Sequence, residues 1–312
     1  MDQRVISNHA LLNSALAGLR ASPKTLDSKW FYDTEGSRLF EKITQLAEYY
    51  PTRTETAILT KYADELSTYC SEGGALVELG SGASVKTKIV LDAMQSLSSY
   101  LPVDIAEEFL YESARDLAVN YPSLAVRPVV ADFTKPFDLP LGLIDVPKSV
   151  FFPGSTIGNL SHDEAVDLLS HVRSFSNVEM FILGADLVKS EDILVPAYDD
   201  ASGVTADFNL NLLTRLNREV GADFDRSAFE HVARWNAVDS RIEMHLVSKT
   251  QQVVNIAGND IHFQKDETIH TENSRKYTPD SLEKIAQAAS WKVEKIFTDE
   301  NDYFAVAVLL PV

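Results

Sequence analysis

The sequence predicts a doubly wound α/β fold, in which helices cover both faces of a mainly parallel sheet. Short apolar runs alternate with longer segments whose apolar residues recur at helical spacing. A glycine turn, Gly80-Ser81-Gly82, follows the first apolar run, and Ser84 can cap the helix expected next. Polar residues or glycines follow most of the expected strands, as is typical of the ligand-binding edge of such a sheet.

The alternation of short apolar runs and helical segments spans residues 75–184. The strands expected there lie, in chain order, at 75–77, 100–105, 125–130, 148–153 and 178–184. Helices are expected at 84–98 and 106–120, and Ser161 with Glu164 predicts a capping box for a third helix. The carboxyl ends of parallel strands share one edge of a sheet, so the candidates for ligand binding are the residues at those ends. These are Gly80, Asp104, Asp132 and Asn159.

The segments on either side of this alternation are less regular. The N-terminal leucine spacing predicts a short amphipathic helix. Residues 29–55 are rich in aromatic side chains and favour packed loops, with a second small core as the alternative. A helix is expected at 54–70. A loop is expected at 194–203, followed by a helix at 204–220 that Gly221 ends. A strand at 241–247 is expected to pair with one at 260–265 across a turn at 257–259. The remaining expected elements are a polar connection at 271–277, a helix from Thr278 to Ser290 and a strand at 304–310.

These patterns predict two domains. Residues 61–195 plus 286–312 are expected to bind a cofactor, and residues 1–60 plus 196–285 are expected to form an α+β substrate-binding domain. No apolar run approaches the length that spans a bilayer, and the N-terminal residues do not resemble a signal peptide.

Composition narrows the classes of partner. The formal net charge of −18 repels nucleic-acid phosphates and anionic membrane surfaces, so we expect neither as a partner. The single cysteine, Cys70, excludes an internal disulfide and suits a reducing cytoplasm. The seven histidines are scattered along the chain, so no metal site is expected. A monomer that acts on a small molecule fits these observations best.

The residues at the strand ends favour one cofactor over another. A dinucleotide site commonly has a third glycine after the turn, and Ser84 stands there instead. Asp104 suits a ribose diol, which NAD and S-adenosylmethionine share. Asp132 and Phe133 suit the edge and the face of an adenine ring. Because no acid/base pair for hydride transfer is evident, S-adenosylmethionine is the better prediction. The alternative for each acid is a helix cap or a solvated loop carboxylate.

Longer motifs carry a family resemblance. They are KWFYD at 29–33, EYYPTRTE at 48–55, ELGSG at 78–82, FPGSTIGN at 152–159 and TENS at 271–274. From about Ser28 to its C-terminus the chain resembles the histidine-specific N-α-methyltransferases of ergothioneine biosynthesis. The resemblance implies a Rossmann-like class I methyltransferase sheet with a second, family-specific α+β domain. It also implies three methyl transfers from S-adenosylmethionine to the α-amino group of L-histidine, which give hercynine.

The same resemblance implies roles for individual residues. Tyr49, Asn159 and Tyr198 are expected to bind the carboxylate and the amine of the substrate. Glu272 and Ser274 are expected to bind its imidazole. The pocket wall is expected to contain Tyr32, Phe40, Thr205 and Met244. The expected cofactor contacts are Gly80, Ser81, Gly82, Lys86, Asp104, Asp132 and Phe133. We expect Tyr32 and Asn159 to act next to the reacting amine, with Tyr32 or water passing its proton on.

Three alternatives remain open at this stage. Relatives of this family methylate indole amino acids, although a carboxylate at Glu272 accepts a hydrogen bond from an imidazole N–H and so favours histidine. A non-catalytic module that binds S-adenosylmethionine is the second alternative, and a nucleotide-dependent dehydrogenase is the third.

Overall fold

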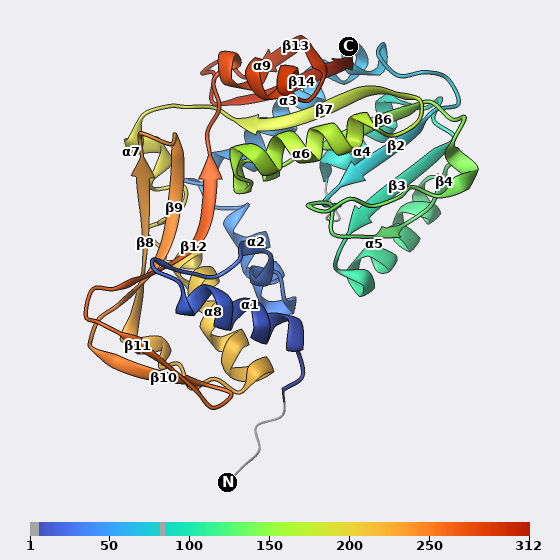
Figure 1. Ribbon diagram of the computed structural model, residues 1–312. Coiled ribbons are helices and arrows are strands. Elements are labelled where there is room, and N and C mark those ends of the chain that lie inside the picture. Colours follow the sequence, from blue (N-terminus) through green and yellow to red (C-terminus); the bar gives the residue numbers. More distant parts are fainter. Residues whose placement is uncertain (1–5, 82–84) are drawn as a thin grey trace. The chain divides into compact units, whose positions relative to one another are not determined.

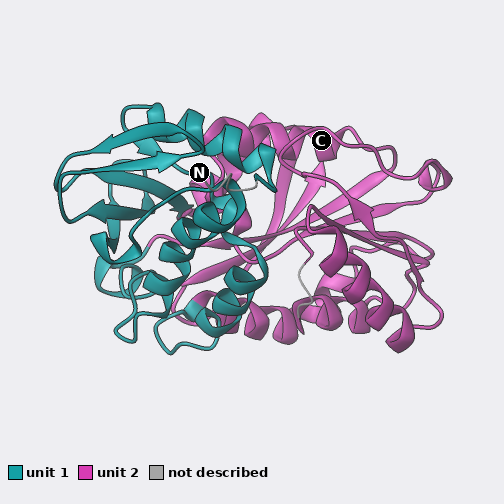
Figure 2. Ribbon diagram, turned by 90° about the horizontal axis from the view of Figure 1, so that it is seen from below, with its two compact units in different colours: residues 1–50, 189–275 teal, residues 51–188, 276–312 magenta. Residues whose placement is uncertain are grey.

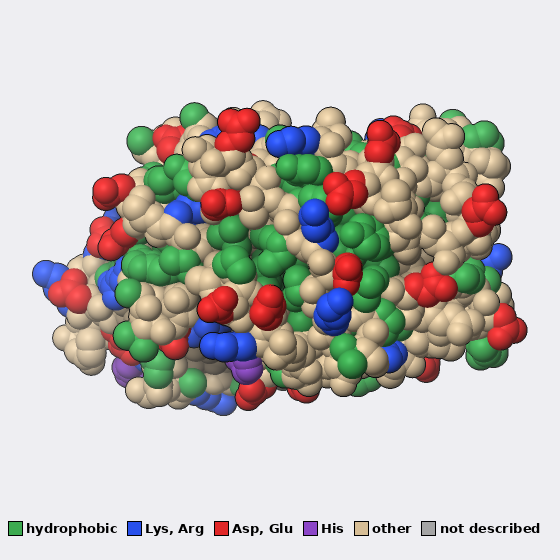
Figure 3. Space-filling view, turned by 90° about the horizontal axis from the view of Figure 1, so that it is seen from above, with side chains coloured by type: hydrophobic (Ala, Val, Ile, Leu, Met, Phe, Trp, Pro, Cys, Tyr) green, Lys and Arg blue, Asp and Glu red, His purple; other side chains and the backbone are tan. Residues whose placement is uncertain are grey.

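A computed structural model describes residues 6–81 and 85–312 (Figure 1). The chain forms two compact units (Figure 2). Unit 1 comprises Met1–Tyr50 and Lys189–Arg275, and unit 2 comprises Pro51–Val188 and Lys276–Val312. The domain boundaries expected from the sequence lie later in the chain, at residues 60, 195 and 285. On the face shown in Figure 3, acidic and basic side chains are interspersed, so the excess negative charge is not gathered into one patch there.

Unit 2 is built on a sheet with the strand order β13-β14-β7-β6-β2-β3-β4, and β5 also pairs with β3. Its strands are β2 (Ala75–Leu79), β3 (Ser99–Asp104), β4 (Ala125–Val126), β5 (Val129–Val130), β6 (Lys148–Phe152), β7 (Val178–Asp186), β13 (Trp291–Thr298) and β14 (Phe304–Pro311). Its helices are α3 (Tyr50–Ser67, which starts at the last residue of unit 1), α4 (Val85–Ala93), α5 (Glu107–Asn120), α6 (His162–Arg173) and α9 (Pro279–Ala288). The pairs from β4 to β7 are parallel.

Alternate residues of the central strand β2 enter two different cores. Val77 packs with residues of α6 and α9, whereas Leu76 packs with residues of α3 and α4. A strand that is buried on both faces needs helices on both sides of the sheet. The prediction of a doubly wound α/β fold is therefore confirmed for unit 2.

Three details of unit 2 differ from the sequence expectations. The strand expected at 125–130 is two short strands, because Pro128 between them has no N–H for the ladder. The C-terminal strand β14 runs antiparallel to β7 and pairs with β13, a strand that was not predicted. The helix expected at 84–98 ends at Ala93, and the proposed Ser84 cap lies outside the described residues.

Unit 1 contains an antiparallel sheet and a separate hairpin. The sheet order is β1-β12-β9-β8, and the strands are β1 (Lys24–Thr25), β8 (Phe229–Asn236), β9 (Arg241–Ser248) and β12 (Thr268–Arg275). The hairpin joins β10 (Gln252–Ile256) to β11 (Asn259–Phe263). The helices are α1 (His9–Arg20), α2 (Thr34–Ile43), α7 (Glu191–Leu194) and α8 (Val204–Val220), and α8 contacts α1, α2, β8 and β9.

The sequence expectations were less accurate for unit 1. The pairing of 241–247 with 260–265 is wrong: the turn at Ala257-Gly258 joins β10 to β11, while β9 lies between β8 and β12. The expected polar connection at 271–277 is largely strand β12, whose backbone pairs with β9. The loops expected at 29–55 include the whole of α2, for which Asp33 provides the N-cap. The expected end of α8 at Gly221 is confirmed, with the left-handed φ of 66° that glycine tolerates.

No helix in the described parts of the chain is both long enough and apolar enough to cross a membrane.

Candidate functional site

The glycine turn at the end of β2 is closely packed. Gly80 has a φ of +69°, and the N–H groups of Gly80 and Ser81 both donate to the carbonyl of Val103 at the end of β3, at 2.9 and 3.2 Å. A Cβ at position 80 would lie 3.3 Å from the ring of Phe133. A glycine therefore allows the predicted aromatic residue to lie against the turn. The predicted contact at Gly82 falls outside the described residues.

A buried polar network lies directly beneath this turn. The Glu78 carboxylate is fully buried and accepts hydrogen bonds from Tyr100 Oη at 2.6 Å and from Thr87 Oγ1 at 2.9 Å. Ser81 Oγ lies 3.0 Å from Tyr100 Oη. Burial raises the pKa of Glu78 to about 7, and the hydroxyl donors only partly oppose it. Tyr100 and Thr87 were not singled out from the sequence, because hydroxyls inside apolar or helical segments give no separate signal.

The next two strands bring the predicted carboxylates to the same edge of the sheet. The N–H of Ala131, just after β5, donates to the backbone oxygen of Asp104 at 3.0 Å. The Asp104 side chain accepts from the N–H of Ala106 at 2.8 Å, and burial raises its pKa. Asp132 accepts from the N–H of Thr134 at 3.1 Å. Each of these carboxylates accepts a hydrogen bond from a backbone N–H of the turn that follows it, and Lys135 Nζ lies 3.5 Å from Asp132 Oδ2.

Lys86, a predicted cofactor contact, is held by a buried acid. Its Nζ lies 2.7 Å from Glu55 Oε2, and Glu55 also accepts from the N–H of Gly154 at 2.9 Å. A Cβ at Gly184 would come within 2.1 Å of Glu55 Oε1, so only glycine leaves room for this carboxylate. Glu55 is the residue that sequence reasoning missed here, although it closes the motif at 48–55. It connects α3, α4 and the turn after β6.

Asn159 ends the short 3-10 helix Thr156–Asn159 that follows β6. The capping box of α6 is formed by Ser161 and Glu164, as predicted, so Asn159 is not needed as that cap. The backbone at Ser155 is left-handed, with a φ of 57°, and Ser155 Oγ accepts from the N–H of Asp186 at 2.9 Å. This bond fixes the turn after β6 to the end of β7.

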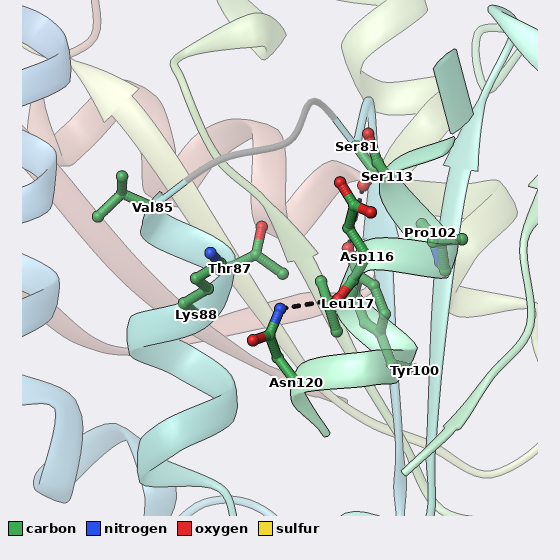
Figure 4. Close-up of a pocket in the computed structure, with 11 residues that line it drawn as sticks. Ser81, Val85, Thr87, Lys88, Tyr100, Pro102, Ser113, Asp116, Leu117 and Asn120 are labelled. Carbon is green, nitrogen blue, oxygen red and sulfur yellow. Dashed lines mark hydrogen bonds between the residues drawn. The ribbon is translucent and has the colours of Figure 1, made fainter. Parts of the chain in front are cut away.

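A cavity of about 160 Å³ lies next to Ser81 of the glycine turn (Figure 4). Residues of β3, α4 and α5 line it, including Tyr100, Thr87 and Leu117, and one predicted cofactor contact, Ser81. Asp104, Asp132 and Phe133 do not line it. Ligand pockets are usually larger, from about 300 Å³ upward. The cavity is therefore distinct from the edge at which the predicted cofactor residues gather.

The predicted rings of unit 1 form a continuous aromatic cluster. The Tyr32 and Phe40 centroids are 5.6 Å apart, those of Phe40 and Tyr49 6.2 Å, and those of Tyr49 and Tyr198 6.0 Å. Tyr32 and Phe40 also pack against Phe208 of α8. The segment at 29–55 thus contributes to a small core and supplies the rings expected at the pocket.

Strand β12 places the predicted imidazole contacts on one face of the sheet. Ser274 Oγ lies 2.7 Å from Tyr198 Oη. Glu272 lies opposite Met244, and Ser274 lies opposite Ile242, so all four share a face. A bulge at Thr271 separates them from His270, which lies opposite His245. Without the bulge, period-two alternation would put His270 and Glu272 on the same face.

The segment around Tyr198 is fixed by polar groups that the sequence did not reveal. His231 Nε2 lies 2.8 Å from the backbone oxygen of Tyr198, and Asn209 Nδ2 lies 2.8 Å from His231 Nδ1. Asp200 accepts from the N–H groups of Val204 and Thr205 at the start of α8, at 3.0 and 2.7 Å. Burial opposes ionisation of Asp200, but the bonds from Ser202, Thr205 and Val204 outweigh it and lower the pKa to about 2.

The two units hold different sets of predicted residues. Unit 1 contains the residues expected at the amino-acid pocket, namely Tyr32, Phe40, Tyr49, Tyr198, Thr205, Met244, Glu272 and Ser274. Unit 2 contains the expected cofactor contacts that the structure describes, namely Gly80, Ser81, Lys86, Asp104, Asp132 and Phe133, and it also contains Asn159.

A doubly wound sheet with a glycine turn and carboxylates at neighbouring strand ends defines the class of α/β proteins that bind a nucleotide-type cofactor. A sequence model of the family described as "Histidine-specific methyltransferase, SAM-dependent" matches residues 11–311. The chain therefore belongs to the histidine-specific, S-adenosylmethionine-dependent methyltransferase family, as its motifs indicated, and its cofactor is S-adenosylmethionine.

Individual relatives agree with this assignment. A histidine N-alpha-methyltransferase of Mycolicibacterium smegmatis is 41% identical over 307 residues, which cover 96% of this chain and 94% of the relative. The protein of the same name from Mycobacterium tuberculosis is 39% identical over 309 residues, with the same shares. The N-methyltransferase imqF of Aspergillus flavus is 28% identical and covers 96% of this chain and 84% of its own length.

Proposed function

We propose that this protein transfers three methyl groups in succession to the α-amino group of L-histidine, giving hercynine for ergothioneine biosynthesis. The observation that carries the proposal is the face of β12, where Glu272 and Ser274 lie together and Ser274 is bonded to the Tyr198 phenol. The two histidine N-alpha-methyltransferases that are about two-fifths identical over nearly the whole chain support the same substrate. The single cysteine suits action in the cytoplasm.

Unit 2 is proposed to hold the cofactor at the carboxyl edge of its sheet. Asp104 would accept hydrogen bonds from the ribose hydroxyls, and Asp132 with Phe133 would bind the edge and the face of the adenine. A Cβ at position 80 would lie 3.3 Å from the Phe133 ring, so glycine lets the backbone of the turn approach the ring that would bind the adenine. When bound, S-adenosylmethionine supplies a methyl group that is activated by its positively charged sulfur.

The residues of unit 1 expected at the pocket are proposed to bind the amino acid, and Asn159 is proposed as a further contact. Glu272 accepts a hydrogen bond from the imidazole, and Ser274 is held in place by Tyr198. Phenol and amide groups at Tyr49, Tyr198 and Asn159 bind the charged ends of the amino acid without adding a full charge. The faces of the tyrosine rings attract the growing, finally quaternary ammonium.

Methyl transfer requires a neutral amine, and each step forms one N–C bond while the S–C bond breaks. A free α-amino group loses its proton at a pH of about 8. Tyr32 is 43% exposed, and its hydroxyl is the proposed route by which the amine proton leaves to water. The pocket groups contribute mainly alignment of the amine, which is the larger need for so reactive a methyl donor.

Replacing Glu272 by alanine tests the substrate assignment. Losing a charged hydrogen bond to the imidazole should lower kcat/KM for histidine by about 100-fold, from a loss of about 3 kcal/mol. Mass spectrometry of the mono-, di- and trimethyl products from histidine, tryptophan and tyrosine measures both rate and selectivity.

The matched control is Asn273→Ala, on the same strand but on the opposite face of the sheet. It should leave selectivity unchanged. A wild-type enzyme that prefers tryptophan, or a Glu272→Ala variant with unaltered selectivity, would contradict the histidine assignment.

A further inference from the structure

The face of the unit 1 sheet opposite Glu272 carries a second group of polar side chains. Glu243 and His245 lie two residues apart on β9, and His270 of β12 lies directly opposite His245. In a strand, residues two apart share a face, and so do directly opposite residues of neighbouring strands. The three side chains therefore point to one side of the sheet. Nothing in the proposed methyl transfer uses them.

The ligand atoms of these side chains are close enough to share one ion. One such atom from each of Glu243, His245 and His270 lies within 4.8 Å of the other two. His245 Nε2 is 3.2 Å from Glu243 Oε2. Two ligands of a tetrahedral zinc ion, with bonds of about 2.0 Å each, stand about 3.3 Å apart. The rings of His245 and His270 lie with their centroids 4.7 Å apart.

The surroundings hold these groups as supporting residues do in metal sites. Asn236 Nδ2 and Arg241 Nε donate to Glu243 Oε1 at 2.9 and 2.8 Å, which leaves Oε2 directed at His245. His270 Nε2 lies 3.0 Å from the backbone oxygen of Glu272. When Nε2 carries the proton of that bond, Nδ1 keeps the lone pair that a metal needs.

Burial and hydrogen bonding act differently on two of these groups. Burial is the main reason that the pKa of His245 falls to about 4, so its imidazole is neutral near pH 7. Burial works against ionisation of Glu243, but hydrogen bonds from Asn236, Arg241 and His245 lower its pKa to about 2. A metal at Nε2 of His245 replaces its bond to Glu243 and leaves the ring proton on Nδ1.

We propose that Glu243, His245 and His270 form a binding site for a divalent cation of the zinc type, separate from the proposed histidine pocket. Two imidazoles and one carboxylate are ligands that zinc accepts, and a fourth position is left for water. Arg234 lies opposite Glu243 on β8, so its charge opposes the cation. The bound ion joins β9 to β12 next to the bulge that directs Glu272 to the other face.

The test is calorimetric titration of Zn²⁺ into the full-length protein after dialysis against a chelator. One ion should bind per chain, and the melting temperature should rise with zinc. His270→Ala and Glu243→Gln should each weaken zinc binding by at least about tenfold. His262→Ala, which removes an exposed histidine on β11, should leave it unchanged. Circular dichroism confirms that each variant is folded.

Two results would overturn the proposal: wild-type protein that binds no zinc at 100-fold molar excess, or His262→Ala that weakens binding as much as His270→Ala. His245→Ala provides a second removal of a ligand should either of the other variants fail to fold. The titration needs no methyl transfer, so its outcome is independent of the proposed function.

Discussion

Unit 2 presents its predicted site residues at the ends of strands, whereas unit 1 presents them on the face of a sheet. In unit 2, Gly80, Asp104 and Asp132 follow β2, β3 and β5, and parallel pairing alone brings them to one edge. In unit 1, Glu272 and Ser274 depend on the register of β12 against β9 and on the bulge at Thr271. Topology therefore decides the first set, and register decides the second.

Glu78 of unit 2 also differs from Asp200 and Glu243 of unit 1 in the direction in which its pKa is shifted. Glu78 in unit 2 is surrounded by hydroxyl donors, and burial raises its pKa to about 7. In unit 1, burial also opposes the charges of Asp200 and Glu243, but N–H donors are among their hydrogen-bond partners and both pKa values fall to about 2. Glu78 is more deeply buried than Asp200 and Glu243, so the depth of burial and the number of hydrogen-bond donors together set the direction of each pKa shift.

A one-residue insertion in β12 should have the largest effect, because it changes the register of unit 1 and leaves unit 2 unaltered. Placing an alanine between Glu272 and Asn273 moves Glu272 and Ser274 to opposite faces of β12. Histidine kcat/KM should fall by at least about 100-fold, because Glu272 and Ser274 can no longer both contact the imidazole. Calorimetry should show cofactor affinity nearly unchanged, since the cofactor is proposed to bind unit 2.

Deleting Thr271 is the matched control, since it removes the extra residue of the bulge and leaves Glu272 opposite Met244. Histidine turnover should then fall by no more than about tenfold. If the deletion lowered histidine turnover as much as the insertion does, the face of β12 on which Glu272 lies would not determine substrate binding.

The pH dependence of stability should distinguish Glu78 from the acids of unit 1. Its pKa is about 7 in the folded protein and 4.5 as a free side chain, so the folded state binds the extra proton between these values. Stability therefore falls as the pH rises from 4.5 to 7 and is level above that. Relative to Glu78→Gln, the wild type should lose about 3 kcal/mol of unfolding free energy across this range. Urea unfolding at pH 5 and pH 8 measures the difference, and equal shifts in both proteins would refute the assignment.

A smaller effect should follow the loss of one strand-end acid. Asp104→Ala removes the proposed acceptor for the ribose and should weaken S-adenosylmethionine binding by about tenfold, from a loss of about 1.4 kcal/mol. Calorimetry with the cofactor alone measures this change. Glu112→Gln, an exposed change on α5, should have no effect. Unaltered affinity in Asp104→Ala would place the ribose elsewhere.

The fold of unit 2 could be predicted because its signals are local. Apolar runs give buried strands, Ser161 and Glu164 give a capped helix, and the polar residues at the strand ends follow from parallel pairing. The family could also be identified, because its motifs are continuous stretches of sequence. Glu55 was missed as the partner of Lys86, because that contact joins residues 31 apart in the chain, and Thr87 was missed because a hydroxyl inside a helix gives no separate signal.

Local patterns in the sequence were enough to identify the family, its cofactor and the parallel sheet of unit 2. Only the tertiary structure decided which strands of unit 1 pair, that Thr271 is the bulged residue, and that His245 lies beside His270. Antiparallel pairing between segments far apart in the chain leaves no periodic signal in either segment, and a single unpaired residue reverses the facing of every side chain beyond it.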